Sequence, residues 1–211
     1  MVSVKICGIT NWDDAKLAMD AGADALGFNF YANSPRRIAL SRAKQVIRRM
    51  PSCVAAVGVF VNASAKEIVR IARAANLTAL QLHGEESPAT VERLAREYPV
   101  LKAFRVGPGF RLSELKRYAD ASGFLLDGYD RERHGGTGKR FDWEIAREAK
   151  RYGPVILAGG LRAENVADAI REAEPFGLDV CSGVEQRPGT KDAKKVRRLM
   201  AAVRRMHEQD L

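Results

Sequence analysis

Two residues that each end an apolar run carry side chains that can move a proton. Cys7 ends the run Val4-Lys5-Ile6, and Asp127 ends the run Phe124-Leu125-Leu126. A thiolate can remove a proton and a carboxylic acid can supply one, so this pair suits general acid–base catalysis. Lys5 shares a strand face with Cys7, and a nearby cation lowers the pKa of a thiol below its usual ~8.5. The alternatives are a small buried apolar cysteine and an aspartate that caps a turn.

Four other segments carry groups that suit the binding of an anion. Glycines after an apolar run let a ligand approach the backbone, and helix N-termini favour anions. An arginine in a turn stiffened by proline can hold a carboxylate through two parallel hydrogen bonds. The residues concerned are Gly159 and Gly160, Ser182 and Gly183, Arg36 after Ser34-Pro35, and His83 in Gln81-Leu82-His83-Gly84. A solvated surface arginine and a structural histidine are the alternatives.

A further glycine-rich segment, Gly135-Gly136-Thr137-Gly138-Lys139-Arg140, is similar to a phosphate loop but lacks two required residues. Arginine stands at positions 133 and 140, where such a loop needs glycine and then serine or threonine. We interpret this segment as a loop near the site that does not bind a nucleotide.

The cysteines and histidines do not show the spacing of a metal site. The three residues of each type are Cys7, Cys53 and Cys181, and His83, His134 and His207. No two cysteines stand close enough for a zinc or redox motif, so we predict no metal. An odd and sparse set of cysteines argues against a disulfide framework and for a reducing compartment, so we expect a cytoplasmic protein.

The elements that position these residues repeat along the chain. Apolar, β-branched runs alternate with amphipathic runs at a mean spacing of about 25 residues, which fits one strand, two loops and one helix. The strands are centred near Lys5, Phe28, Val57, Gln81, Ala103, Leu125, Ile156 and Val180. The helices are expected to start at Asn11 or Asp13, Ser41, Ser64, Ser87, Ser113, Asp142, Ala163 or Glu164, and Asp192.

Eight such units predict a single-domain (β/α)₈ TIM barrel over residues 1–211. A doubly wound open sheet is the alternative, although no G-x-G-x-x-G follows the first strand. In a barrel, functional residues lie at the carboxyl ends of the strands, and phosphate commonly binds after strands seven and eight. The barrel therefore brings the proton-moving and anion-binding residues to one end.

The composition limits the classes of protein to which this chain can belong. The chain has 211 residues, a formal charge of +9, 46% hydrophobic and 29% charged residues, which fits a folded globular domain. The longest apolar run, 54–61, is too short for a membrane span, and no signal peptide is visible. Five apolar residues of the basic C-terminal segment fall at helical spacing: Val196, Leu199, Met200, Val203 and Met206. We therefore expect a solvated outer helix and neither a nucleic acid nor a membrane as partner.

Nine strings, in order along the chain, resemble the phosphoribosylanthranilate isomerases of tryptophan biosynthesis. They are 4–10, 22–30, 34–36, 57–60, 81–84, 125–127, 135–139 with 141–143, 157–161 with 164–166, and 182–185 with 188–189 and 191–192. Two positions depart from the pattern of that family. Cys181 stands where serine or another small polar residue is usual, and Gly128 stands where serine or threonine is commoner.

The resemblance implies a (β/α)₈ barrel that catalyses an Amadori rearrangement. N-(5'-phosphoribosyl)anthranilate would become 1-(2-carboxyphenylamino)-1-deoxyribulose 5-phosphate, with Cys7 as general base and Asp127 as general acid. Arg36 would hold the anthranilate carboxylate. The other substrate contacts would come from His83, Gly159, Gly160, Asp179, Ser182 and Gly183. No metal or organic cofactor is implied, the partner is a small phosphorylated substrate, and the protein is expected to be a monomer or a homodimer.

Other functions remain open at this point. The sister sugar-phosphate isomerase of histidine biosynthesis would use a pair of aspartates, one of them in place of Cys7. Cys7 therefore distinguishes the two isomerases. Indoleglycerol phosphate synthase is normally longer, with more lysine and glutamate at its site. A basic nucleic-acid-binding protein would show salt-dependent binding to DNA.

Overall fold

The computed structural model describes residues 2–128 and 143–209, and these form a closed parallel barrel of eight strands in the order β1 to β8. The strands are β1 Ser3–Cys7, β2 Ala25–Asn29, β3 Ala55–Phe60, β4 Ala79–Leu82, β5 Val100–Val106, β6 Gly123–Gly128, β7 Val155–Ala158 and β8 Gly177–Val180. Each predicted strand centre lies within one of them. The predicted (β/α)₈ barrel is therefore confirmed, and the open sheet is wrong.

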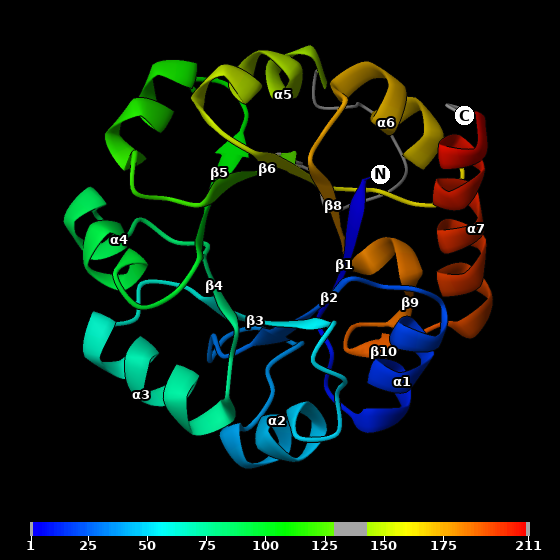
Figure 1. The fold of residues 1–211 in the computed structure, drawn as a ribbon, viewed down its shortest axis with the longest axis horizontal. Coiled ribbons are helices and arrows are strands. Elements are labelled where there is room, and N and C mark those ends of the chain that lie inside the picture. Colours follow the sequence, from blue (N-terminus) through cyan, green and yellow to red (C-terminus); the bar gives the residue numbers. More distant parts are fainter. Residues whose placement is uncertain (1, 129–142, 210–211) are drawn as a thin grey trace.

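Helices surround the barrel on its outside (Figure 1). The α-helices are α1 Trp12–Asp20, α2 Leu40–Ile47, α3 Ala65–Ala75, α4 Pro88–Ala95, α5 Trp143–Ala149, α6 Val166–Ala173 and α7 Ala193–Gln209. The 3-10 helices are η1 Leu112–Tyr118, η2 Lys150–Tyr152 and η3 Ser182–Val184. The segments β9 Glu185–Arg187 and β10 Thr190–Lys191 form a separate antiparallel hairpin, which the sequence patterns did not predict.

The alternation of side chains along β1 sets what faces the barrel interior. Val4 and Ile6 are buried in the core between strands and helices, so Lys5 and Cys7 point the other way, as predicted. Gly27 pairs with Cys7 on the neighbouring strand. A Cβ atom at Gly27 would lie 2.6 Å from the sulfur of Cys7 and 2.9 Å from Nζ of Lys5. The missing side chain therefore makes room for both groups.

Polar residues cap most helices where the sequence predicts. Asn11, Ser64 and Ser87 each accept a hydrogen bond from a backbone N–H of the first turn. Asp192 accepts two such bonds at the start of α7. The expected start at Asp142 lies outside the described residues.

Three predicted helix starts are wrong. Ser41 lies inside α2, because the chain turns into the helix directly after Ile38, whose N–H donates to the carbonyl oxygen of Asn29. Ser113 lies inside η1, which is a 3-10 helix. The helix α6 begins at Val166 and not at Ala163 or Glu164, since the side chain of Asn165 closes the preceding turn by bonding Arg162 and Gly160.

The long helix α7 packs against α1 and α6 on the outside of the barrel (Figure 1). All five apolar residues predicted for its inner face are buried. The basic residues between them, from Lys194 to Arg205, are exposed. The basic segment is therefore a solvated helix face. Among the described residues, no helix is long and apolar enough to cross a membrane.

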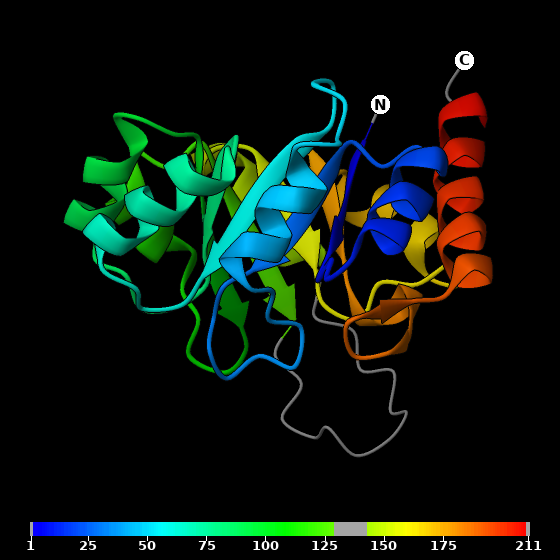
Figure 2. The same cartoon turned by 90° about the horizontal axis from the view of Figure 1, so that it is seen from below.

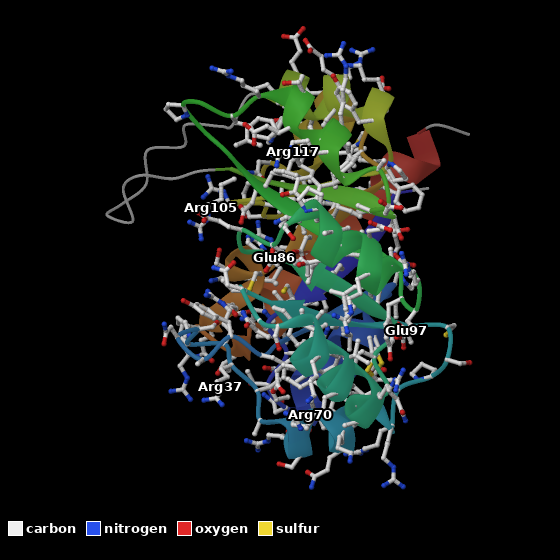
Figure 3. All side chains as sticks on the ribbon, turned by 90° about the vertical axis from the view of Figure 1, so that its left-hand side faces the viewer. Arg37, Arg70, Glu86, Glu97, Arg105 and Arg117 are labelled. Carbon is white, nitrogen blue, oxygen red and sulfur yellow. The ribbon has the colours of Figure 1, made fainter. Side chains whose placement is uncertain are left out.

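The two ends of the barrel differ in what they carry. The β9–β10 hairpin lies at the carboxyl ends of the strands, whereas the chain ends lie on the opposite side (Figure 2). Labelled charged residues follow the same division: Arg37 follows β2 and Arg105 is near the end of β5, whereas Glu97 precedes β5 on the other side (Figure 3). The candidate residues therefore gather at the hairpin end.

Candidate active site

Cys7 lies above a buried ion pair. Nζ of Lys5 is 2.8 Å from Oδ1 of Asp179, and both side chains are almost fully buried inside the barrel. Hydrogen bonding with the Cys181 thiol, together with the charge of Lys5, lowers the pKa of Cys7 to about 6 against the opposing effects of burial and Asp179. Burial alone would lower the pKa of Lys5, but Asp179 and the Cys7 thiolate raise it. At neutral pH, Cys7 is therefore a thiolate beside a lysinium ion.

Arg36 reaches the same place from the loop after β2, where Glu185 holds it. Nε of Arg36 is 3.0 and 3.1 Å from the two carboxylate oxygens, and Nη2 is 2.7 Å from Oε2. Burial opposes the charge of Glu185, but Arg36 and Lys191 outweigh it and keep the pKa of the carboxyl below its usual value. The second terminal nitrogen of Arg36 makes no contact with Glu185, so the guanidinium retains donors for another anion.

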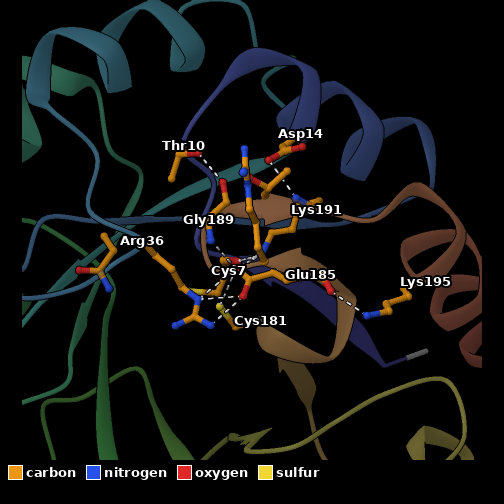
Figure 4. A network of polar contacts seen from close by, with 12 residues as sticks. Cys7, Thr10, Asp14, Arg36, Cys181, Glu185, Gly189, Lys191 and Lys195 are labelled. Carbon is orange, nitrogen blue, oxygen red and sulfur yellow. Dashed lines mark hydrogen bonds and ion pairs between the residues drawn. The ribbon is translucent and has the colours of Figure 1, made fainter.

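The β9–β10 hairpin is tied to the end of β1 by a network around Glu185 (Figure 4). Nζ of Lys191 donates to the carbonyl oxygen of Cys7 and lies 3.1 Å from Oε1 of Glu185. The N–H of Gly189 donates to the same oxygen at 3.1 Å, and Oγ1 of Thr10 donates to the carbonyl of Gly189 at 2.7 Å. These bonds fix the loops on both sides of Cys7.

Asp127 ends β6, which β7 and β8 separate from β1 around the barrel. Its Oδ2 lies 3.4 Å from Nε2 of His83 at the end of β4, and Nδ1 of His83 lies 3.0 Å from Nε2 of Gln81. These two contacts hold the imidazole between Asp127 and Gln81. Asp127 is partly exposed, so it can meet both His83 and a ligand.

A buried ion pair anchors the loop that carries His83. Nζ of Lys102 is 3.1 Å from Oε2 of Glu86 and 2.7 Å from the carbonyl oxygen of Gly84. Oε1 of Glu86 accepts the N–H of Asn62, and both its carboxylate oxygens accept the N–H of Gly84. Both the N–H and the carbonyl oxygen of Gly84 are therefore held by hydrogen bonds. These bonds fix the backbone from which the side chain of His83 extends.

The loops after β7 and β8 form a glycine-lined recess. Gly159 and Gly160 adopt φ values of +88° and +63°, a region that disfavours other residues. A Cβ at Gly183 would lie 1.8 Å from the carbonyl oxygen of Leu161, so the two loops touch through backbone. An adjacent cavity of about 380 Å³ is lined by Gly160, Arg162, Ala163, Glu164, Ser182, Gly183, Lys195 and Arg198. Backbone groups and cations there suit an anion such as phosphate.

The structure brings most predicted site residues to one end of the barrel. One group of predicted residues lies at the carboxyl ends of β1, β2 and β8: Cys7, Arg36 and the Ser182-Gly183 loop. Gly159 follows β7, which lies between β8 and the strand β6 that carries Asp127. A Cβ at Gly159 would lie 2.8 Å from Oδ1 of Asp127. Asp179, expected among the substrate contacts, pairs with Lys5 and is 8% exposed, and its contact with substrate stays a prediction. The segment 135–140 lies outside the described residues.

Sequence reasoning missed three residues of the site. Glu185 and Lys191 were noted only as parts of matching strings, although they hold Arg36 and the backbone of Cys7. Arg105 pairs in register with Asp127 and is exposed at the end of β5. Its place at a strand end is a signal that could have identified it. Among the described residues, no group of histidine, cysteine, aspartate and glutamate is arranged to hold a metal ion.

The fold and the site together define a (β/α)₈-barrel enzyme with acid–base groups and anion-binding loops at the carboxyl ends of its strands. The family described as N-(5'-phosphoribosyl)anthranilate (PRA) isomerase matches residues 4–202. The chain belongs to this family and is an isomerase.

Known relatives and solved structures agree with this assignment. An N-(5'-phosphoribosyl)anthranilate isomerase of Citrifermentans bemidjiense is 49% identical over 206 residues, which is 98% of both chains. The phosphoribosyl anthranilate isomerase of Thermotoga maritima superimposes with a TM-score of 0.90 at 38% identity, covering 97% of this chain and 99% of that one. A structure of a phosphoribosyl anthranilate isomerase in complex with reduced 1-(o-carboxyphenylamino)-1-deoxyribulose 5-phosphate has a TM-score of 0.87 at 36% identity, covering 97% of this chain and 99% of that one.

Proposed function

We propose that this protein converts N-(5'-phosphoribosyl)anthranilate into 1-(2-carboxyphenylamino)-1-deoxyribulose 5-phosphate in tryptophan biosynthesis, with Cys7 as general base and Asp127 as general acid. The observation that carries this proposal is the state of Cys7: a strand-end thiol whose pKa is lowered to about 6. In the sister isomerase of histidine biosynthesis, an aspartate would stand at the position of Cys7. A thiolate at this position therefore favours N-(5'-phosphoribosyl)anthranilate as the substrate.

The reaction begins with opening of the furanose ring. As the general acid, Asp127 supplies a proton to the ring oxygen, while the lone pair of the anthranilate nitrogen expels that oxygen and leaves an iminium ion. His83, 3.4 Å from Asp127, holds the carboxyl group in place. A donor fixed in this way needs no rearrangement at the moment of transfer.

The second step removes the proton from C2 of the sugar. The positive iminium acidifies this carbon, and the thiolate of Cys7 accepts its proton to give an enolamine, which tautomerises to the ketone. Lys5 and Asp179 act beneath Cys7 as positioning residues, because the lysinium charge favours the thiolate. The reaction transfers only protons within one molecule, so the residues of the chain are sufficient for its chemistry.

The two anionic groups of the substrate match the two anion-binding regions. Gly159, Gly160, Ser182 and Gly183 would bind the phosphate, and the free edge of Arg36 would bind the carboxylate. The relative bound to a reduced product analogue supports this proposal, since that ligand carries both a carboxyl and a phosphate.

The test is to generate the substrate in the cuvette from anthranilate, a phosphoribosyl donor and the preceding transferase, and then to add this protein. We expect the anthranilate-type fluorescence to fall without added metal, and not to fall with Cys7→Ala. If a folded wild-type protein leaves the fluorescence unchanged, the proposal fails, and the phosphorylated substrate of the histidine-pathway isomerase is the next to test.

The ionisation of Cys7 predicts the acidic side of the pH profile. Because the thiolate is the active base, kcat/KM should fall about tenfold per pH unit below the Cys7 pKa of about 6. Cys181→Ala removes the donor to the thiolate and should move this midpoint upward, whereas Cys181→Ser keeps a hydroxyl donor and should leave it nearer the wild-type value. A midpoint that is identical in all three proteins would contradict the assignment of Cys181.

The contact of Arg36 with the carboxylate predicts a binding defect. Arg36→Ala should raise KM by about 10- to 100-fold, since charge-assisted hydrogen bonds contribute about 1.5–3 kcal/mol each. The matched control is Arg37→Ala, because the neighbouring Arg37 is exposed. Steady-state kinetics separate the two parameters, and an unchanged KM for Arg36→Ala would exclude the proposed contact.

We infer that the protein acts as a monomer or a homodimer on a small phosphorylated substrate. The isomerase of Thermotoga maritima is described as dimeric, and monomers have been generated from it. Light scattering behind a sizing column distinguishes the two states, since the chain mass is 23.2 kDa.

A further inference from the structure

Two cysteines face each other where the barrel closes. The parallel register between β1 and β8 pairs Lys5 with Asp179 and Ile6 with Val180, so its next step sets Cys7 opposite Cys181. Neighbouring strands are about 4.7–4.9 Å apart, and disulfides join Cα atoms about 4.4–6.8 Å apart. Each thiol has the largest effect on the pKa of the other, and Figure 4 places both cysteines in one network, where the Cys181 sulfur also lies 3.8 Å from Oε1 of Glu185. The backbone separation therefore suits a covalent bond.

We propose that Cys7 and Cys181 form a reversible disulfide when the protein meets a peroxide, and that this pair is a modification site that switches the catalytic base off. The proposal concerns the two sulfur atoms and is testable without turnover. Its consequence for activity rests on the function proposed for Cys7.

The chemistry follows from the states of the two thiols. The Cys7 thiolate attacks one oxygen of hydrogen peroxide, the O–O bond breaks, and Cys7 sulfenic acid and hydroxide form. The sulfur of Cys181 then displaces hydroxide from the sulfenic sulfur, giving the disulfide, while the thiol proton and hydroxide leave as water. Two thiols are oxidised and one peroxide is reduced to two waters. A small dithiol reverses the reaction by exchange.

The surroundings of Cys181 suit the second step. The hydrogen bond with Cys7, burial and the charge of the thiolate raise the pKa of Cys181. Conversion of Cys7 to a neutral sulfenic acid removes that negative charge. Lys191 and Arg36 remain, and both favour an ionised Cys181. Oxidation of the first sulfur therefore prepares the second to attack it.

The experiment uses protein with Cys53→Ser, because Cys53 is exposed, precedes β3 at the far end of the barrel, and could link two molecules. Hydrogen peroxide is added in small excess, and free thiols are blocked. Without the blocking groups, we expect the intact mass to be lower by two hydrogens. After digestion, we expect a peptide that joins residues 7 and 181. Absence of that cross-linked peptide while activity is lost would overturn the proposal.

A second variant distinguishes reversible disulfide formation from irreversible oxidation of Cys7. In Cys53→Ser with Cys181→Ser, Cys7 has no partner, so peroxide should carry it to the sulfinic acid, which a dithiol does not reverse. We expect a dithiol to restore most of the activity of the single variant and little of that of the double variant. Equal recovery in both would contradict a Cys7–Cys181 bond. If neither protein isomerises the substrate, the proposed function fails, while the mass result still decides the disulfide.

Discussion

Cys7→Ser is expected to lower kcat by about 10²–10⁴-fold, the range for losing one acid–base group. Serine is nearly the same size as cysteine, but its hydroxyl stays protonated where the thiol of Cys7, with a pKa of about 6, is ionised. The ion pair of Lys5 and Asp179 does not depend on the sulfur, so the barrel should stay folded. KM should change little, because the anion-binding loops are untouched.

The measurement is steady-state kinetics combined with a thermal melt, and Cys53→Ser is the matched control. That substitution makes the same chemical change at an exposed site on the opposite end of the barrel, so its kcat should equal the wild-type value. If Cys7→Ser retains a near-normal kcat with its fold intact, the thiol is not the base.

Asp127→Asn is expected to lower kcat by a similar ~10²–10⁴-fold, because an amide of the same shape does not supply the acid proton. The contact with His83 and the turn into Gly128 should persist, so the loss would come from chemistry and not from folding. Asp20→Asn is the control, since Asp20 is an exposed aspartate paired with Lys16 on the surface of α1. Its effect should be negligible.

A substrate with deuterium at C2 of the sugar distinguishes the two roles. If Cys7 removes that proton, Cys7→Ser makes this step limiting and should show a large primary isotope effect. If Asp127 opens the ring, Asp127→Asn makes an earlier step limiting and should suppress the isotope effect. A reversed pattern would exchange the two roles, and equal effects in both variants would contradict separate steps.

The barrel itself could be predicted from the sequence, because each strand is an apolar run with its own local signal. The helix starts at Asn11, Ser64 and Ser87 could be predicted for the same reason: a capping oxygen acts on N–H groups only three residues away. The starts at Ser41 and Ser113 failed because contacts with the preceding strand or loop decided where the helix begins.

The site was only partly predictable. Cys7 and Asp127 lie at the carboxyl ends of strands and Arg36 lies in the loop after one, so the strand pattern points to them. The bidentate pair of Arg36 with Glu185 joins residues 149 apart in sequence and depends on a hairpin whose strands have three and two residues. No pattern among neighbouring residues predicts a contact between residues so far apart in the sequence. Burial of Asp179 opposite Lys5 likewise follows from closure of the barrel and not from its neighbours in sequence.

The seam between β1 and β8 has a consequence for how the molecule matures. Cys7 belongs to the first strand made, whereas Cys181, which lowers its pKa most, and Lys191, which binds its backbone carbonyl, come from the end of the chain. The Lys5–Asp179 contact spans 174 positions. Until β8 docks, Cys7 is an ordinary protonated thiol on an open sheet edge. Closing so long a loop costs little more entropy than closing one half its length, about 0.6 kcal/mol. The low pKa of Cys7 therefore requires β8 to be docked on β1, and a chain that ends before β8 lacks the Cys181 contact that lowers it.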